Sequence, residues 1–109
     1  MALDQSFIPS YTTAIRLTPD TTSVTGVFQR QENASTSVTI TNTSSTVFVY
    51  IRIFNSRRTA TATATVNDYL ILPNEKRVLS KHPDDDSIAV LGSALAASNS
   101  LHVIAGSGY

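Results

Sequence analysis

The stretch Val47-Phe48-Val49-Tyr50-Ile51-Arg52-Ile53-Phe54 decides the fold, because its residues alternate with a period of two. The odd-numbered residues are all β-branched and form one apolar face, whereas the even-numbered residues form a second, mostly aromatic face. A strand that is apolar on both faces is either covered on both sides or part of an interface. We therefore expect a strand here, with Phe48, Tyr50, Arg52 and Phe54 as candidate interface residues.

Short alternating segments continue on both sides of this stretch and stop at turn residues such as Pro, Asn, Asp and Gly. None of them keeps a helical period over ten residues. They are residues 14–18, 24–29, 37–41, 59–66, 69–72, 76–80, 87–91 and 101–105. This pattern predicts an all-β protein, an antiparallel β-sandwich of about eight strands. Jelly-roll and immunoglobulin-like topologies both stay open at this point.

Residues 59–66 read Thr-Ala-Thr-Ala-Thr-Ala-Thr-Val. The period of two predicts a strand, with four Thr on one face. Ala60, Ala62, Ala64 and Val66 share the other face. Small side chains on an inward face allow an opposing sheet or subunit to approach closely.

The length of 109 residues suits one domain, which we place at residues 15–109. Residues 1–14 form an N-terminal extended arm in this interpretation, because their apolar residues show no clear period. Phe7, Ile8 and Tyr11 are the apolar members of the arm and are further interface candidates. We expect the arm to be held by its own domain or to reach a neighbouring chain.

The charge composition limits the classes of partner. Lys plus Arg and Asp plus Glu both number 8, and charged residues make up only 15% of the chain. Zero net charge excludes a generally basic surface, so we expect no nucleic-acid partner, although Arg52, Arg57 and Arg58 lie near aromatic residues. Low charge favours self-association instead. The longest apolar run is far shorter than the ~20 residues of a membrane span, and the start of the chain lacks a signal-peptide pattern.

No set of residues points to catalysis or metal binding. Cysteine is absent, which excludes disulfides, thiolate metal sites and cysteine nucleophiles. His82 and His102 are the two histidines, and no Ser lies on a nucleophile elbow. His82 with residues 84–86 offers one nitrogen and three carboxylates, but the spacing is not that of a calcium loop. We therefore predict a protein that is not an enzyme and has no metal site and no cofactor.

Four segments follow one another in the second part of the chain: a turn followed by an apolar strand, a Thr-rich strand with Ala, a strand that ends in a Leu-Pro turn, and a closing apolar strand with a Gly-containing tail. These segments are residues 39–49, 60–66, 70–75 and 101–108. By their order, residues 36–109 resemble the small structural proteins of tailed bacteriophages.

The resemblance implies a β-sandwich virion protein without enzymatic activity. Such proteins often decorate or cement the capsid as trimers, through self-association and contacts to the major capsid protein or other virion proteins. The protein would be made in the cytoplasm of the host bacterium and end in the virion, with no nucleic acid or membrane as a partner. The alternative is a receptor- or glycan-binding module at the tail vertex or on a fibre.

Overall fold

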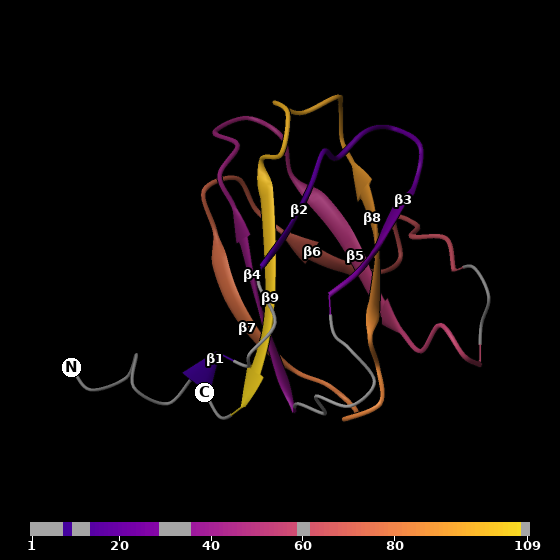
Figure 1. Ribbon diagram of the computed structural model, residues 1–109. Helices are drawn as coiled ribbons and strands as arrows, with labels where there is room; N and C mark the ends of the chain where they lie inside the picture. Colours follow the sequence, from indigo (N-terminus) through magenta and orange to yellow (C-terminus); the bar gives the residue numbers. More distant parts are fainter. Residues whose placement is uncertain (1–7, 10–13, 29–35, 59–61, 108–109) are drawn as a thin grey trace.

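Two antiparallel sheets form the computed structural model, which describes residues 8–9, 14–28, 36–58 and 62–107 (Figure 1). In sheet A, β4 (Ser37–Asn42) lies between β7 (Lys76–Ser80) and β9 (Leu101–Ser107). The short strands β1 (Ile8–Pro9) and β2 (Ile15–Leu17) pair with the other edge of β9. β2 lies along the start of β9, and β1 lies along its end. In sheet B, the order is β3 (Val24–Val27), β8 (Ser87–Gly92), β5 (Val49–Phe54) and β6 (Tyr69–Ile71). The predicted all-β sandwich is confirmed.

The strand pairing selects the jelly roll from the two topologies that the sequence leaves open. β2 pairs with β9, β3 with β8, β4 with β7 and β5 with β6. Each later pair lies between the two strands of the pair before it in the sequence. The chain therefore resembles one long hairpin that is wound into two sheets, and this is the jelly-roll topology.

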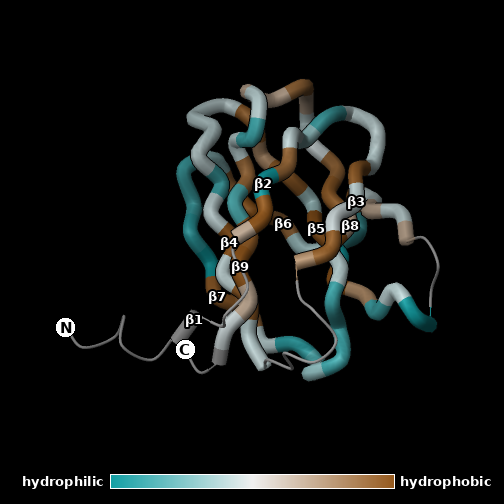
Figure 2. The backbone as a smooth tube through the Cα atoms, viewed as in Figure 1, coloured by the Kyte–Doolittle hydropathy of each residue, from teal (hydrophilic) through white to brown (hydrophobic). Residues whose placement is uncertain are grey.

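The core lies between the two sheets and is built from the inward-facing residues, which are every second residue along a strand. Val49 and Ile51 of β5 and Val38 and Ile40 of β4 belong to one core cluster, and all four are at most 2% exposed. The other fully buried members of this cluster include Ile71, Ile88, Val90, Leu101, Val103 and Ala105. Figure 2 shows that hydrophobic residues follow the strands, whereas the connection from β7 to β8 is hydrophilic. Within the described ranges, no helix is long and apolar enough to span a membrane.

The predicted strand at residues 59–66 is wrong over the part that the structure describes. Residues 62–66 pair with no strand, and Val66 is 65% exposed. Ala62 and Ala64 are buried as expected, at 7% and 2% exposure. The reason is that β6 pairs with one edge of β5 and β8 pairs with the other. No edge of β5, the strand that precedes this segment, is left for it to pair with. Ala60 lies outside the described residues.

The N-terminal arm contributes one short strand to its own chain. Ile8 lies opposite Ser107, and Pro9 lies opposite Gly106, at the end of β9. Residues 1–7 and 10–13 lie outside the described part of the chain, so contact of the arm with a neighbouring chain stays a prediction.

Gly92 is a position where a side chain would disturb the fold. A Cβ atom there would lie 2.9 Å from the carbonyl oxygen of Ala94, 3.0 Å from Cβ of Pro19 and 3.2 Å from the amide nitrogen of Asp20. We expect Gly92→Ala to lower the free energy of unfolding by about 2 kcal/mol, because backbone atoms must move to make room. Urea denaturation measures this change.

Gly26→Ala is the matched control. Its Cβ would meet Cδ1 of Ile15 at 2.9 Å and Cδ2 of Leu17 at 3.0 Å, which are the ends of side chains that can rotate away. We expect the smaller loss for Gly26→Ala. Equal losses in the two variants would contradict this explanation.

Thr39 carries a buried hydroxyl that we expect to destabilise the fold. The residue is 6% exposed, and its Oγ1 atom is buried without a hydrogen-bond partner in the described structure. Val has nearly the same shape, so we expect Thr39→Val to raise the free energy of unfolding by about 1 kcal/mol. Thr43→Val should act in the opposite direction, because Oγ1 of Thr43 donates a 2.6 Å hydrogen bond to the carbonyl of Ser100. Thermal unfolding of both variants tests the pair, and a lower melting temperature for Thr39→Val would refute it.

Candidate interaction surface

The outer face of sheet B carries a row of apolar residues over three adjacent strands. Tyr50 of β5 lies directly opposite Leu70 of β6 on one side and Leu91 of β8 on the other. Directly opposed residues point to the same side of a sheet. Val49 and Ile51 point into the core, so this row points away from it.

Two more residues extend the row toward the end of the sandwich. Phe48 precedes β5 and Leu72 follows β6, and each continues the alternation of its strand. We call the five side chains together the outer patch: Phe48, Tyr50, Leu70, Leu72 and Leu91.

The outer patch is partly exposed and uncharged. Leu70 is 41% exposed and Leu72 is 52% exposed, whereas the other three members are half-buried. The rings of Phe48 and Tyr50 pack edge to face, with centroids 5.8 Å apart and an interplanar angle of 87°. The backbone of Phe48 is fixed by Ser93, whose amide donates to the Phe48 carbonyl at 2.9 Å. Contiguous exposed apolar residues on rigid strands are typical of a protein-binding surface.

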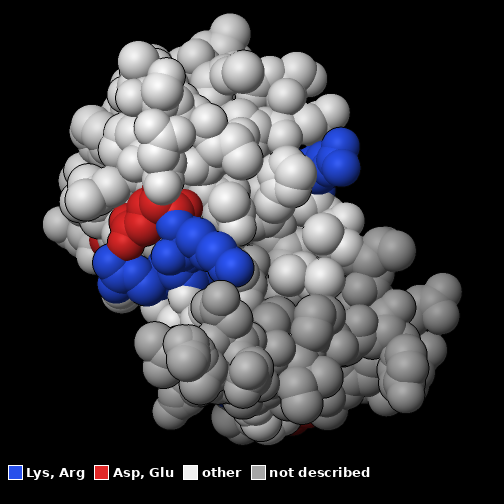
Figure 3. All heavy atoms as spheres, turned by 90° about the vertical axis from the view of Figure 1, so that its left-hand side faces the viewer, with Lys and Arg blue, Asp and Glu red and all other residues white. Residues whose placement is uncertain are grey.

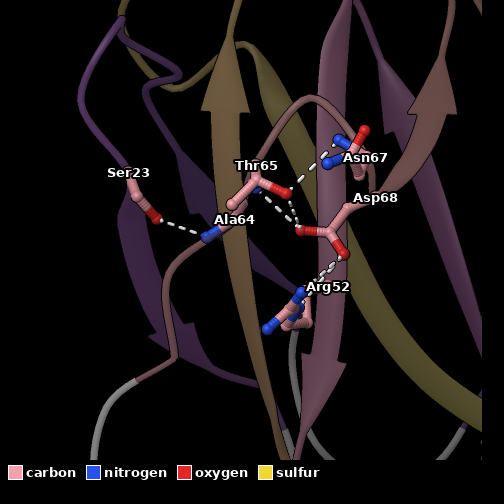
Figure 4. A network of polar contacts seen from close by, with 6 residues as sticks. All are labelled: Ser23, Arg52, Ala64, Thr65, Asn67 and Asp68. Atoms are coloured by element: carbon pink, nitrogen blue, oxygen red, sulfur yellow. Dashed lines mark hydrogen bonds and ion pairs between the residues drawn. The ribbon is translucent and has the colours of Figure 1, made fainter.

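A strap segment, residues 62–68, crosses the outer face of sheet B beside the outer patch (Figure 4). On one side, the amide of Ala64 donates to Oγ of Ser23, which precedes β3, at 3.0 Å. On the other side, the segment leads into β6 through a turn that Asp68 closes. Ala89 of β8 faces outward in this region, opposite Arg52, and is 0% exposed. The small Ala side chains therefore let the strap segment lie close against the sheet.

Asp68 joins the strap segment to β5. Its Oδ2 accepts a 2.7 Å hydrogen bond from the amide of Thr65, and its Oδ1 lies 3.1 Å from the Arg52 guanidinium. Burial alone would raise the pKa of Asp68, but the Thr65 amide and the Arg52 cation outweigh it and lower the pKa. The carboxylate stays ionised at neutral pH, so the Arg52–Asp68 pair forms a charged border along the apolar outer patch.

The structure brings together some of the residues predicted as interface candidates and separates others. Phe48 and Tyr50 lie in the outer patch, and Arg52 lies at its border. Phe54 shares the outer face and is half-buried, but it lies two residues beyond Arg52, opposite Ser87. Ile8 lies in β1, where its side chain is not described, and Phe7 and Tyr11 lie outside the described residues.

Sequence reasoning missed the leucines of the outer patch. Leu70 and Leu72 lie in a segment predicted as a strand, and their spacing of two places them on one face. That spacing was the available signal. The sequence could not show that this face lies beside Tyr50, because the register of β5 and β6 comes from the folded sheet.

The edge of the sandwich next to the outer patch is closed by polar contacts between the two sheets. Arg77 of β7 forms an ion pair with Glu75. Its guanidinium also donates a hydrogen bond to the hydroxyl of Tyr69 and lies 5.6 Å from the centroid of the Tyr69 ring. Oε1 of Glu75 accepts the amide of Leu72 at 2.7 Å. The Leu72 amide and the Arg77 guanidinium lower the pKa of Glu75. These contacts hold β6, and with it Leu70 and Leu72, against β7.

The loop after β7 brings one of its carboxylates beside His82 and turns another away. Oδ2 of Asp84 lies 3.9 Å from Nδ1 of His82, which also accepts the amide of Asp84 at 3.2 Å. Asp86 turns inward and binds Ser56 and Ser87. Across the described ranges of the chain, no three potential ligands come together as a metal site.

Comparison with known proteins gives no relative: no protein-family model, curated protein or solved structure matches this chain.

Proposed function

We propose that the protein is a non-enzymatic structural protein of a bacteriophage virion, which decorates or cements the capsid through self-association and contacts to the major capsid protein. The observation that carries the proposal is the outer patch, a partly exposed apolar surface on a domain of low charge. The jelly-roll fold supports it by analogy, because this architecture is frequent in viral capsid domains. The resemblance of residues 36–109 to phage structural proteins supports the same setting.

The proposed mode of action is burial of surface between subunits. Fully burying a leucine side chain contributes about 1.5–3 kcal/mol, and Leu70 and Leu72 have about half of their surface left to bury, so each would contribute about 1 kcal/mol. One such patch makes a modest contact. Many copies on a repeating shell bind far more tightly, because each attached copy raises the effective concentration of the next contact.

A count of copies in purified particles tests the virion setting. Quantitative mass spectrometry of particles from the virus that encodes this chain would compare its amount with that of the major capsid protein. Hundreds of copies per particle are the expected result for shell decoration. A handful of copies would place the chain at the tail vertex instead, and absence from the particles would overturn the proposal.

The alternative, a receptor- or glycan-binding module, has one observation in its favour. Tyr69 is 43% exposed at the sheet edge, and exposed aromatic rings can stack on sugars. The guanidinium of Arg77 lies over one face of that ring, 5.6 Å from its centroid, so a sugar would have to stack on the other face. The outer patch therefore favours the structural role. A glycan array separates the two functions, since specific glycan binding that Tyr69→Ala removes would support the alternative.

A further inference from the structure

The strap segment is held on the outer face of sheet B by few contacts. In the part of the chain that the structure describes, one hydrogen bond joins residues 62–66 to a residue outside the segment, from the amide of Ala64 to Oγ of Ser23 at 3.0 Å. The other hydrogen bonds of the segment, among Thr65, Asn67 and Asp68, close a turn within it. Residues 62–66 therefore lack the ladder of backbone hydrogen bonds that fixes a strand in a sheet.

The strap segment covers part of the sheet with small side chains. Ala89 of β8 points outward and is 0% exposed, although its register partners Thr25 and Arg52 are both exposed. Ala62 and Ala64 of the strap segment are 7% and 2% exposed, so they lie against the sheet. A contact between alanine side chains buries little apolar area, so it holds the segment weakly.

The covered surface lies between the outer patch and Phe54. Along the outer face of β5, Tyr50 belongs to the outer patch, Arg52 comes next and Phe54 follows it. Ala89 lies directly opposite Arg52 on β8. With the strap segment moved aside, the outer patch, Ala89 and Phe54 would form one apolar face that only Arg52 interrupts.

The outer patch alone is small for a stable contact between subunits. Specific protein interfaces commonly take about 20–30 residues from each partner, whereas the outer patch consists of five side chains. The adjoining side of the molecule, on which β7 lies, is less suited to enlarge the contact, because basic and acidic side chains lie together there (Figure 3). Enlargement across the outer face of sheet B requires the strap segment to move.

We propose that the strap segment is an autoinhibitory cover, which moves aside when a second copy of the chain docks on the outer patch and on the surface beneath the segment. This inference rests on the proposed function, which supplies the second copy. The strap segment and the second copy compete for one surface, so the full contact forms only in the open state. The affinity is then reduced by the fraction of molecules that are open. The closed strap segment therefore limits the assembly of free subunits.

Ser23→Ala tests the competition, because it removes the acceptor of the Ala64 amide and leaves the outer patch unchanged. Loss of one neutral hydrogen bond changes an equilibrium constant about fivefold. We therefore expect Ser23→Ala to assemble at about fivefold lower concentration than wild type in sedimentation equilibrium. If the strap segment only supported the patch, its loosening would weaken assembly or leave it unchanged.

Thr18→Val is the matched control. Oγ1 of Thr18 accepts the amide of Asn99 at 2.9 Å, which is a hydrogen bond of the same kind that does not involve the strap segment. Both residues are half-buried, so the two variants should lose similar stability. Thr18→Val should assemble like wild type. Equal assembly of the two variants would overturn the inference.

Amide hydrogen exchange of the full chain, followed by NMR, gives a second readout. In the monomer, the amide of Ala64 should exchange at least about a hundredfold faster than those of Ile51 and Val90, which lie in strands paired on both sides. An ordinary interface slows exchange, but the Ala64 amide should exchange faster in the assembled protein than in the monomer, because the strap segment is displaced.

The outcomes separate this inference from the proposed function. Wild-type protein that assembles, together with slower exchange of the Ala64 amide on assembly or with weaker assembly of Ser23→Ala, overturns the inference and leaves the proposed function intact. Wild-type protein that does not assemble overturns the proposed function, and the inference falls with it. Tighter assembly of Ser23→Ala with faster exchange at Ala64 supports both.

Discussion

Asn42→Ala is expected to lower the free energy of unfolding by about 3 kcal/mol, because it leaves several buried backbone groups without partners. Asn42 is 1% exposed. Its Nδ2 donates to the carbonyl oxygens of Val47 at 2.9 Å and Leu72 at 3.1 Å, and its Oδ1 accepts the amide of Ser44 at 3.1 Å. One side chain thus ties the connection between β4 and β5 to the end of β6.

Urea denaturation measures the loss, and Asn67→Ala is its matched control. Asn67 is exposed in the turn before β6, so its truncation should change the free energy of unfolding by no more than about 0.5 kcal/mol. If both variants unfold at the same urea concentration, Asn42 does not have the role described here.

Asp86→Asn is expected to cost about 2–3 kcal/mol at neutral pH, since hydrogen bonds to an ionised carboxylate are stronger than those to an amide. Asp86 is 4% exposed. Its Oδ1 accepts the amide of Ser56 at 3.0 Å and the hydroxyl of Ser87 at 2.9 Å, while Oδ2 accepts the hydroxyl of Ser56 at 2.8 Å. The carboxylate thereby joins the start of β8 to the loop after β5.

The effect of Asp86 depends on pH in a direction that its contacts fix. Burial would raise the pKa of Asp86, but the hydrogen bonds from Ser56 and Ser87 outweigh it and lower the pKa. A lowered pKa in the folded state stabilises the protein above the unfolded value, about 3.9, and this stabilisation is lost as the pH falls through the folded pKa. The difference between wild type and Asp86→Asn should therefore be largest at neutral pH and shrink below about pH 4.

Urea denaturation at several pH values measures this dependence. The exposed Asp84→Asn serves as the control, with little change expected at any pH. A loss for Asp86→Asn that is the same at acidic and neutral pH would rule out the ionised carboxylate as the cause.

The strands were predictable from sequence wherever the alternation of apolar residues coincides with burial on one face. Val38 and Ile40 of β4, and the β-branched residues of β5, show this directly. The order of the strands was not predictable, because pairs such as β2 with β9 join segments far apart in the chain. The pairing that distinguishes a jelly roll from an immunoglobulin-like sandwich comes only from these long-range contacts.

Residues 62–66 show where alternation misleads. Ala62 and Ala64 are buried with the predicted period, yet the amides of Ala64 and Thr65 bond to the side chains of Ser23 and Asp68 instead of a neighbouring strand. Period-two burial needs only an extended chain lying on a surface. A sequence pattern therefore cannot separate a strand within a sheet from a segment that crosses over one.

The candidate site was predictable in part for the same reason. The apolar second face of β5 indicated Phe48 and Tyr50 as interface residues, and both are partly exposed. Leu70 and Leu72, the most exposed members of the outer patch, required the register of β6 against β5. Phe54 has the right spacing but lies apart from the patch, because the Arg52–Asp68 pair intervenes.

Sedimentation equilibrium of the full chain over a wide concentration range tests the central claim, that the outer patch joins subunits. We expect wild-type protein to form an oligomer, with a trimer favoured, and Leu70→Ser with Leu72→Ser to sediment as a monomer. The control is Val27→Ser with Leu95→Ser, which removes two side chains of similar exposure, 58% and 67%, outside the patch and should assemble like wild type. A wild-type protein that remains monomeric at high concentration, or a patch variant that assembles like the control, would contradict the claim.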